Sequence, residues 1–236
     1  MTGIKEKIEK DLVAAGSKKD AVFLQRFFKT GKGQYGEGDI FIGVRAPQNR
    51  AIAKKYFKEI SLEDAEKLLH SPIHEHRVCA LSMLRLKFEN SDVKEQEKIV
   101  KLYLKNTKHI NNWDLVDMSA CYILGPWFYG KNLDTIYKLA GSKFLWEERI
   151  AVLTSFHFLR QKDFKLTLEL CKKFLTHKHD LMHKATGWML REAGKRDVKP
   201  LLSFLDAHAA KMPRTMLRYS VEKLPSAVRK KYMSAK

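Results

Sequence analysis

The segment His-Glu-His-Arg-Val-Cys-Ala-Leu at residues 74–81 decides the fold class, because three later segments repeat its pattern. Segments 112–120, 145–152 and 180–187 each place a polar residue just before an apolar run that contains small residues. The polar positions in register are 77, 117, 149 and 184, which lie 40, 32 and 35 residues apart. Such spacings are typical of helical hairpins that bury their apolar faces against neighbouring repeats. We therefore expect an all-α fold, an α-solenoid with these four positions along one concave groove, although a helical bundle can show similar patterning.

The rest of the chain also has helical patterning. Apolar residues recur at helical spacing in three further places, namely Ile4, Ile8 and Leu12; Val22, Phe23 and Phe27; and Ile52, Tyr56 and Ile60. Helix starts are expected at Pro47, at Ser71-Pro72, at Ser91 or Asp92, and at Asn111 or Asn112. The short extended candidate at 40–44 cannot build a sheet alone.

Length and composition limit the class of protein. The chain has 236 residues, 44% of them hydrophobic, which is enough for one large domain or two small ones. We expect a single repeat domain over residues 1–236.

The longest uncharged stretch, 118–130, is shorter than the roughly 18 residues that span a membrane. Lysines and acidic residues alternate at the N-terminus with no apolar run after them, so we expect neither a secretory signal nor a transit peptide, and a bacterial-type cytosolic location with the nucleoid DNA.

The charge points to a polyanionic partner. The formal net charge is +18, and self-repulsion of that size favours a binding surface for nucleic acid. A merely solubilising basic face is the alternative. Membrane-surface binding would require a basic helix with an unpaired apolar face, and no segment of the sequence clearly predicts one.

Cys79, Cys121 and Cys171 are widely separated and odd in number, which suits reduced core thiols better than disulfides.

Two apparent motifs carry no chemistry. Residues 31–36 match G-x-G-x-x-G, but a helical pattern rather than a strand precedes them, so the segment is interpreted as a basic connection. His179 and His183 have the i, i+4 spacing of two metal ligands, with His177 nearby, yet no carboxylate or cysteine completes a shell. We therefore expect no metal site.

One constellation combines aromatic, acidic and basic residues. Trp113 and Asp117 are i, i+4 on one expected helix and share a face, while Arg149 and Trp188 occupy comparable places in later repeats. A carboxylate in a cationic groove repels the DNA backbone and weakens binding, so the presence of Asp117 there indicates a role other than binding phosphate. Either it acts chemically, or it pairs with Arg149 as a structural ion pair while the tryptophans fill the core.

Several motifs in order resemble the AlkD family of DNA alkylation repair enzymes. They are residues 41–47 (Phe-Ile-Gly-Val-Arg-Ala-Pro), 113–117 (Trp-Asp-Leu-Val-Asp), 145–151, 185–192 and 212–219. The resemblance spans nearly the whole chain. It implies a HEAT-like-repeat DNA glycosylase that excises cationic N3- and N7-alkylated purines from duplex DNA, without metal or cofactor. We expect a monomer, because one concave groove suits one duplex and no heptad or isolated apolar stripe requires a partner subunit.

The resemblance also implies roles for individual residues. Asp117 matches the catalytic carboxylate, Trp113 and Trp188 match the aromatic residues that hold the lesion, and Arg149 matches a cleft residue beside them. Basic residues in and beside the matching segments are candidates for contacts to the DNA backbone. They are Arg45, Arg50, Arg77, Lys184, Arg191, Arg214 and Arg218.

Two alternatives remain open at this point. A non-catalytic module of the same fold would bind bent, branched or damaged DNA without releasing a base. A helical-repeat scaffold for other proteins is a further reading, against which the charge of +18 argues.

Overall fold

The protein is helical throughout its regular structure. A computed structural model describes residues 3–234, and no strand forms within them. The α-helices are α1 (Ile4–Ala15), α2 (Lys18–Phe27), α3 (Ala46–Tyr56), α4 (Leu62–Leu69), α5 (His74–Glu89), α6 (Val93–Lys105), α7 (Trp113–Asp117), α8 (Ala120–Phe128), α9 (Asp134–Ala140), α10 (Leu145–Arg160), α11 (Lys165–Lys173), α12 (Asp180–Arg196), α13 (Val198–His208), α14 (Arg214–Val221) and α15 (Ser226–Met233). Three 3-10 helices are Thr107–His109, Phe174–Thr176 and Ala209–Lys211. The all-α prediction is confirmed.

Local signals set the ends of several helices, as expected from the sequence. Pro47 lies in the first turn of α3, Asp92 caps α6 and Asn112 caps α7. The helix expected after Ser71-Pro72 is α5, which begins at His74. The extended segment at 40–44 builds no sheet; Ile40 forms an isolated parallel bridge to Ile73.

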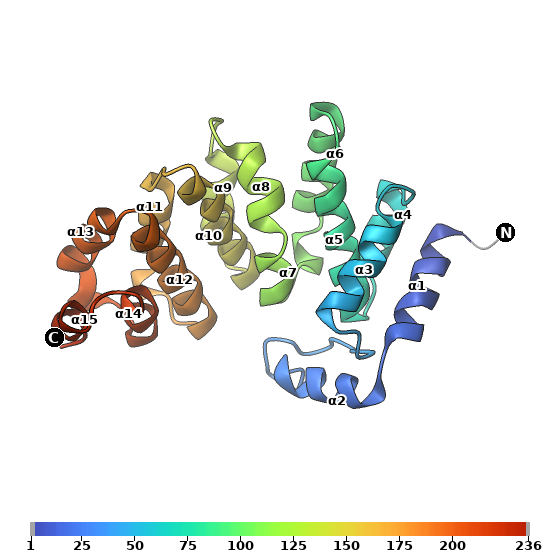
Figure 1. The fold of residues 1–236 in the computed structure, drawn as a ribbon, viewed down its shortest axis with the longest axis horizontal. Helices are drawn as coiled ribbons and strands as arrows, with labels where there is room; N and C mark the ends of the chain where they lie inside the picture. The colour runs from blue at the N-terminus through green and yellow to red at the C-terminus, as the bar shows by residue number, and fades with distance from the viewer. Residues whose placement is uncertain (1–2, 235–236) are drawn as a thin grey trace. The chain divides into compact units, whose positions relative to one another are not determined.

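The described chain forms two compact units, and the division falls between Ser119 and Ala120. In unit 1, the residues before this division, α3 packs on α5 and α5 packs on α7, while α4 and α6 contact α5 and each other (Figure 1). In unit 2, the residues after it, α8, α10, α12 and α14 pack in succession, with α9, α11 and α13 against them. Each helix thus contacts the next helix or the next but one, as in stacked hairpin repeats.

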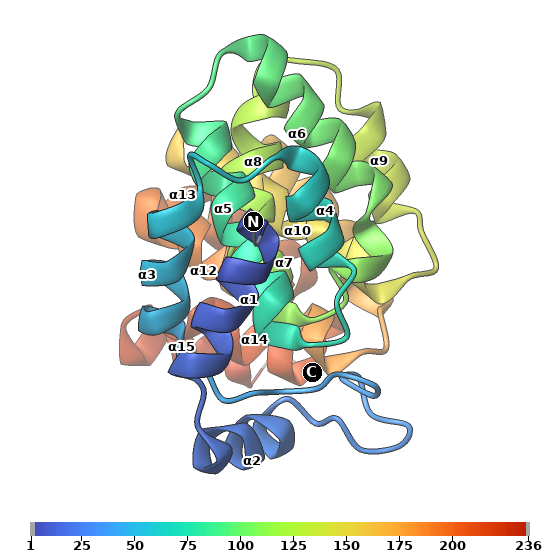
Figure 2. The same ribbon diagram turned by 90° about the vertical axis from the view of Figure 1, so that its right-hand side faces the viewer.

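Helix α2 departs from this packing. None of its residues is buried, and Val22, Phe23 and Phe27 are 72%, 61% and 51% exposed. Figures 1 and 2 both show α2 lying across the end of unit 1, beneath α1 and α3. The helical spacing therefore predicts the helix, while the structure places these three apolar residues on its outer face.

The four positions in register differ in burial. Arg77 and Arg149 are 5% and 4% exposed, whereas Asp117 and Lys184 are half-buried. Matching places in the repeat pattern therefore do not give matching exposure, because different tertiary partners cover them: Asp39 for Arg77 and the start of α12 for Arg149.

Two smaller expectations concern thiols and membranes. Cys79, Cys121 and Cys171 are free and buried, which confirms the prediction of core thiols, and burial raises the pKa of Cys79 to about 12. Among the residues that the structure describes, no helix combines the length and the apolar character needed to cross a membrane.

Candidate functional site

Helix α7 carries two of the expected site residues. The side chain of Asn112 accepts a hydrogen bond from the Trp113 backbone N–H at 2.8 Å and so starts the helix. Leu115 and Val116 are buried, while Trp113 and Asp117 are half-buried. The predicted placement of Trp113 and Asp117 on a single helix, one turn apart, is confirmed.

A buried cluster of charged side chains supports α7 from behind. His74, at the start of α5, is 1% exposed and lies between two carboxylates. Its Nδ1 is 3.0 Å from Asp39 and its Nε2 is 2.8 Å from Asp114 of α7. Arg77 also donates to Asp39, and the Asn112 amide donates to Asp39 at 3.2 Å. The cluster therefore ties α5, α7 and the segment that precedes α3 together.

The cluster holds His74 in its charged form. Both ring nitrogens face carboxylates, and only the imidazolium can donate from both. Burial by itself lowers the pKa of His74, but Asp114 and Asp39 outweigh it and raise the pKa to about 9. Burial raises the pKa of Asp39, yet the hydrogen bond from His74 and the charge of Arg77 outweigh it and hold that pKa below its usual range. Two cations thus face two carboxylates, which offsets the cost of burying them.

A layer of aromatic rings sets the position of Trp113. Phe28 stacks on Trp113 with 5.1 Å between ring centroids and on Phe41 with 5.0 Å. Phe41 in turn stacks on His74 at 4.5 Å. Phe27 lies edge-on to the Trp113 ring, with 6.0 Å between centroids. Trp113 is therefore packed against rings that come from α2 and from the segment after it.

The motif at 41–47 is organised by one buried carboxylate. Glu75 accepts hydrogen bonds from the backbone N–H groups of Ile42, Gly43 and Val44, at distances from 2.7 to 3.2 Å. Gly43 has a φ of +85°, and a Cβ there would lie 2.0 Å from the Ser17 carbonyl oxygen at the start of α2. A glycine is therefore required at this close approach, and the motif holds the start of α2 near α5.

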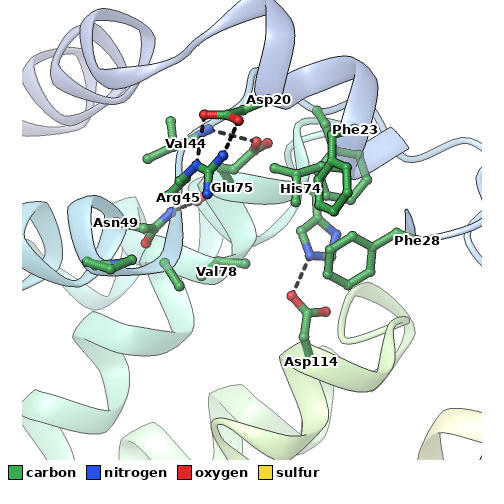
Figure 3. A pocket seen from close by; sticks show the side chains of 14 residues that line it. Asp20, Phe23, Phe28, Val44, Arg45, Asn49, His74, Glu75, Val78 and Asp114 are labelled. Atoms are coloured by element: carbon green, nitrogen blue, oxygen red, sulfur yellow. Dashed lines mark hydrogen bonds and ion pairs between the residues drawn. The ribbon is translucent and has the colours of Figure 1, made fainter. Parts of the chain in front are cut away.

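Next to this motif, Arg45 is exposed and pairs with Asp20 of α2 through two hydrogen bonds of 2.6 and 2.9 Å. Figure 3 shows this pair on one wall of a pocket of about 320 Å³, with Phe23 and Phe28 on another and the His74–Asp114 pair at its floor. The pocket is largely apolar, and α2, α5, α7 and the 41–47 motif enclose it.

A second hollow of about 440 Å³ adjoins the first and shares Asp114 with it. Its basic lining comes from Arg50 and Lys54, one turn apart on α3, and from Arg85 on α5. The sequence prediction includes Arg50 but misses Lys54 and Arg85. The i, i+4 spacing of Arg50 and Lys54 is the signal that points to Lys54.

Arg77 has a different environment from the one expected of a DNA contact. It is buried and bonded to Asp39 in the charged cluster. From the sequence, Arg77 is expected to contact the DNA backbone. In the structure its buried side chain instead holds α5 to Asp39.

The remaining candidates lie in unit 2. Arg149 of α10 is buried, and its Nη1 donates to the Leu181 carbonyl of α12 at 2.6 Å. Trp188 of α12 is half-buried, and its ring lies 5.8 Å from that of Phe156 of α10. Within unit 2, the structure thus brings these two residues onto neighbouring helices.

The basic candidates of unit 2 have varied partners. Lys184 pairs with Asp180 at 2.7 Å, and Arg191 pairs with Glu222. Arg214 and Arg218 are exposed on α14, and Arg214 donates to the Met233 carbonyl at 2.9 Å.

The histidines considered as metal ligands have local partners. The His179 ring accepts from the Leu181 backbone N–H and caps α12, and His177 lies 3.1 Å from Glu148. Within residues 3–234, no group of three or more His, Cys, Asp or Glu side chains could hold a metal ion.

These features define the class as a helical-repeat protein whose short helix α7 presents an aromatic and an acidic side chain. A model of the DNA alkylation repair enzyme family matches residues 8–224. The chain belongs to this family. Membership supports a role for this chain in the repair of alkylated DNA.

Comparison with solved structures gives a similar fold. A structure described as a predicted DNA alkylation repair enzyme from Enterococcus faecalis is similar, with a TM-score of 0.69 and 16% sequence identity, over 89% of this chain and 97% of that one. At this identity the likeness shows the fold alone. A search of curated proteins finds no match.

Proposed function

We propose that the protein is a DNA glycosylase that hydrolyses the N-glycosidic bond of cationic N3- and N7-alkylated purines in duplex DNA, with Asp117 as the catalytic carboxylate. One observation carries the proposal. Asp117 and Trp113 stand one turn apart on a short helix that is capped by Asn112 and braced by the charged cluster through Asp114. Membership of the DNA alkylation repair enzyme family supports it.

The substrate explains why a single carboxylate is enough. An N3- or N7-alkylated purine is already positively charged, so it can leave without receiving a proton. As the bond from the base nitrogen to C1′ breaks, its electron pair passes to the base, which departs neutral, and positive charge develops on the sugar. A carboxylate beside C1′ stabilises that charge more than it stabilises the ground state.

Water completes the reaction. A water oxygen bonds to C1′, one of its protons is lost to Asp117 or to solvent, and an abasic sugar remains. The π face of Trp113 would stabilise the cationic sugar or base by about 0.5–2 kcal/mol when water is excluded, and Trp188 is proposed as a second aromatic contact to the DNA. Arg149, bonded to the start of α12, would position the segment that carries Trp188.

The backbone of the DNA would contact basic side chains. In unit 1 these are Arg45 and Arg50, and in unit 2 they are Lys184, Arg191, Arg214 and Arg218. Contacts of this kind depend little on base sequence and weaken steeply with salt. The positive charge of the chain favours this mode of binding.

The test is the release of 7-methylguanine from methylated duplex DNA. Asp117→Asn should keep its affinity for DNA. It should release the base at least about 100-fold more slowly than the parent, because the neutral amide cannot stabilise the sugar cation. Glu97→Gln is the matched control, since Glu97 is an exposed acid on α6 that pairs with Lys101. If Asp117→Asn releases the base as fast as the parent, the catalytic role is wrong. If the parent releases no base but still binds damaged DNA, the non-catalytic alternative holds.

A further inference from the structure

The outer face of α2 is the most unusual surface of unit 1. Val22, Phe23 and Phe27 together with Lys19 and Arg26 line a shallow hollow there; we call these five residues the α2 face. Large apolar side chains that cluster on a surface, with polar residues around them, mark interaction sites more often than scattered ones do. None of these three apolar side chains is buried, and of the three Phe27 contacts Trp113 and Phe23 also lines the pocket of Figure 3.

The charge of the α2 face selects an anionic partner. Residues 17–32 contain five basic residues, all exposed, which are Lys18, Lys19, Arg26, Lys29 and Lys32. The single acidic residue in this segment, Asp20, is bonded to Arg45. Lys19 and Arg26 make no ion pair with any residue that the structure describes. A partner must therefore bring negative charge and flat or apolar surface together.

The rings of the α2 face continue into the candidate site. Phe23 and Phe27 are one turn apart and nearly parallel, with 5.9 Å between centroids and 15° between planes. Phe27 then contacts Trp113 at 6.0 Å. A row of aromatic rings thus leads from the exposed surface to the tryptophan beside Asp117.

Among anionic partners, a DNA strand with unstacked bases fits this row. Its phosphates can reach Lys19 and Arg26, and its base faces can stack on phenylalanine rings, as in proteins that bind single strands. Intact duplex DNA hides its base faces within the stack. A membrane surface fits less well, because α2 has ten residues and only three apolar side chains on this face.

We propose that the α2 face is a stacking surface for unpaired or unstacked nucleotides, so that the protein prefers gapped or distorted DNA over intact duplex. The inference rests on the proposed function, because it places DNA at α7. It assigns Phe23 and Phe27 to binding the strand that passes the Trp113 site.

The experiment compares binding of one duplex in two forms, intact and with a three-nucleotide gap, neither containing an alkylated base. Fluorescence anisotropy at several salt concentrations should show tighter binding to the gapped form by the parent. The double variant Phe23→Ala/Phe27→Ala should bind gapped DNA on the order of 10-fold more weakly, because stacking on aromatic rings is lost. The single variant Phe23→Ala leaves the Phe27–Trp113 contact in place, so it should weaken binding to gapped DNA while its affinity for intact duplex and its salt dependence stay the same.

Three further variants separate stacking from other effects. Phe23→Trp/Phe27→Trp keeps the rings and should restore the preference for the gap, whereas Phe23→Leu/Phe27→Leu should not. Lys19→Gln/Arg26→Gln should weaken binding to both forms and lower the slope of log K against log salt by about two. Val93→Ala is the matched control, because Val93 is an apolar residue of α6 that is 67% exposed.

Several outcomes would overturn the inference. One is an unchanged preference for gapped DNA in the alanine double variant. Another is full recovery by leucine, which would show a general apolar contact. A third is binding of the parent to phosphatidylglycerol vesicles that the double variant loses while gapped-DNA binding stays. Loss of the excision activity would not affect this test, since the DNA contains no alkylated base; conversely, normal excision with unchanged gap binding would remove this inference alone.

Discussion

The charged cluster around His74 and the α2 face show opposite departures from ordinary packing, and both contact Trp113 or its helix. In the cluster, charged side chains are buried; on the α2 face, aromatic side chains are exposed. Burying charges weakens a fold unless they are paired, and exposing rings forgoes the free energy of burial. Neither arrangement is what stability alone would favour. Helix α7 therefore contacts paired, buried charges through Asp114 and a half-exposed phenylalanine, Phe27, through Trp113.

The largest effect is expected from breaking the cluster. Asp39→Ala removes the carboxylate that faces both His74 and Arg77, so buried Arg77 loses its carboxylate partner and His74 keeps only Asp114. The free energy of unfolding should fall by about 3–5 kcal/mol. Urea denaturation followed by circular dichroism measures this. Asp20→Ala is the control, because the Asp20–Arg45 pair is exposed at Arg45 and its loss should change stability little. Equal stability of the two variants would contradict the importance assigned to the cluster.

A similar contrast is expected between two neighbouring phenylalanines. Phe28 is buried between Trp113 and Phe41, so Phe28→Ala should cost about 3 kcal/mol of unfolding free energy through lost packing. Phe27 is half exposed, and Phe27→Ala should change stability by about 0.5 kcal/mol or less. Parallel urea melts compare the two. If Phe27→Ala is as damaging as Phe28→Ala, the outer face of α2 is part of the core rather than a binding surface.

A smaller and pH-dependent effect is expected from His74. The pKa of His74 is about 9 in the folded protein, against about 6.5 in an unfolded chain, so the folded state binds the proton more tightly. The stabilisation is complete below pH 6.5 and is lost as the pH rises to 9, which amounts to about 1.4 kcal/mol per pH unit within that range.

Melting temperatures at pH 7.0, 7.75 and 8.5 measure this loss. The parent should become less stable across the series, and His74→Gln, which has no titrating ring, should show a flatter dependence. Burial also raises the pKa of the Cys79 and Cys171 thiols, which begin to lower stability as the pH approaches the ordinary thiol pKa of about 8.5; parent and variant share this contribution, so the difference between their curves isolates His74. Parallel curves for parent and variant would show that His74 does not carry the pH dependence.

What the sequence determined by itself is local. The caps at Asp92 and Asn112, the position of Pro47 and the shared helix of Trp113 and Asp117 all follow from interactions within about four residues. Such signals survive in any tertiary context, because helix periodicity and capping hydrogen bonds are made within a single turn. The motifs at 41–47 and 113–117, among others, were also enough to predict the family.

Which faces are covered and which charges meet depends on long-range packing. His74 contacts partners 35 and 40 residues away in the chain, so no local pattern reveals that it is buried between two carboxylates. Arg77 is drawn inside by one of those same carboxylates. The apolar spacing of Val22, Phe23 and Phe27 predicts a helix but not its orientation, because burial depends on what the rest of the fold places against each face. In unit 1, Gly43 lies against the start of α2 and Phe28 is buried directly after its end, while Val22, Phe23 and Phe27 stay 72%, 61% and 51% exposed.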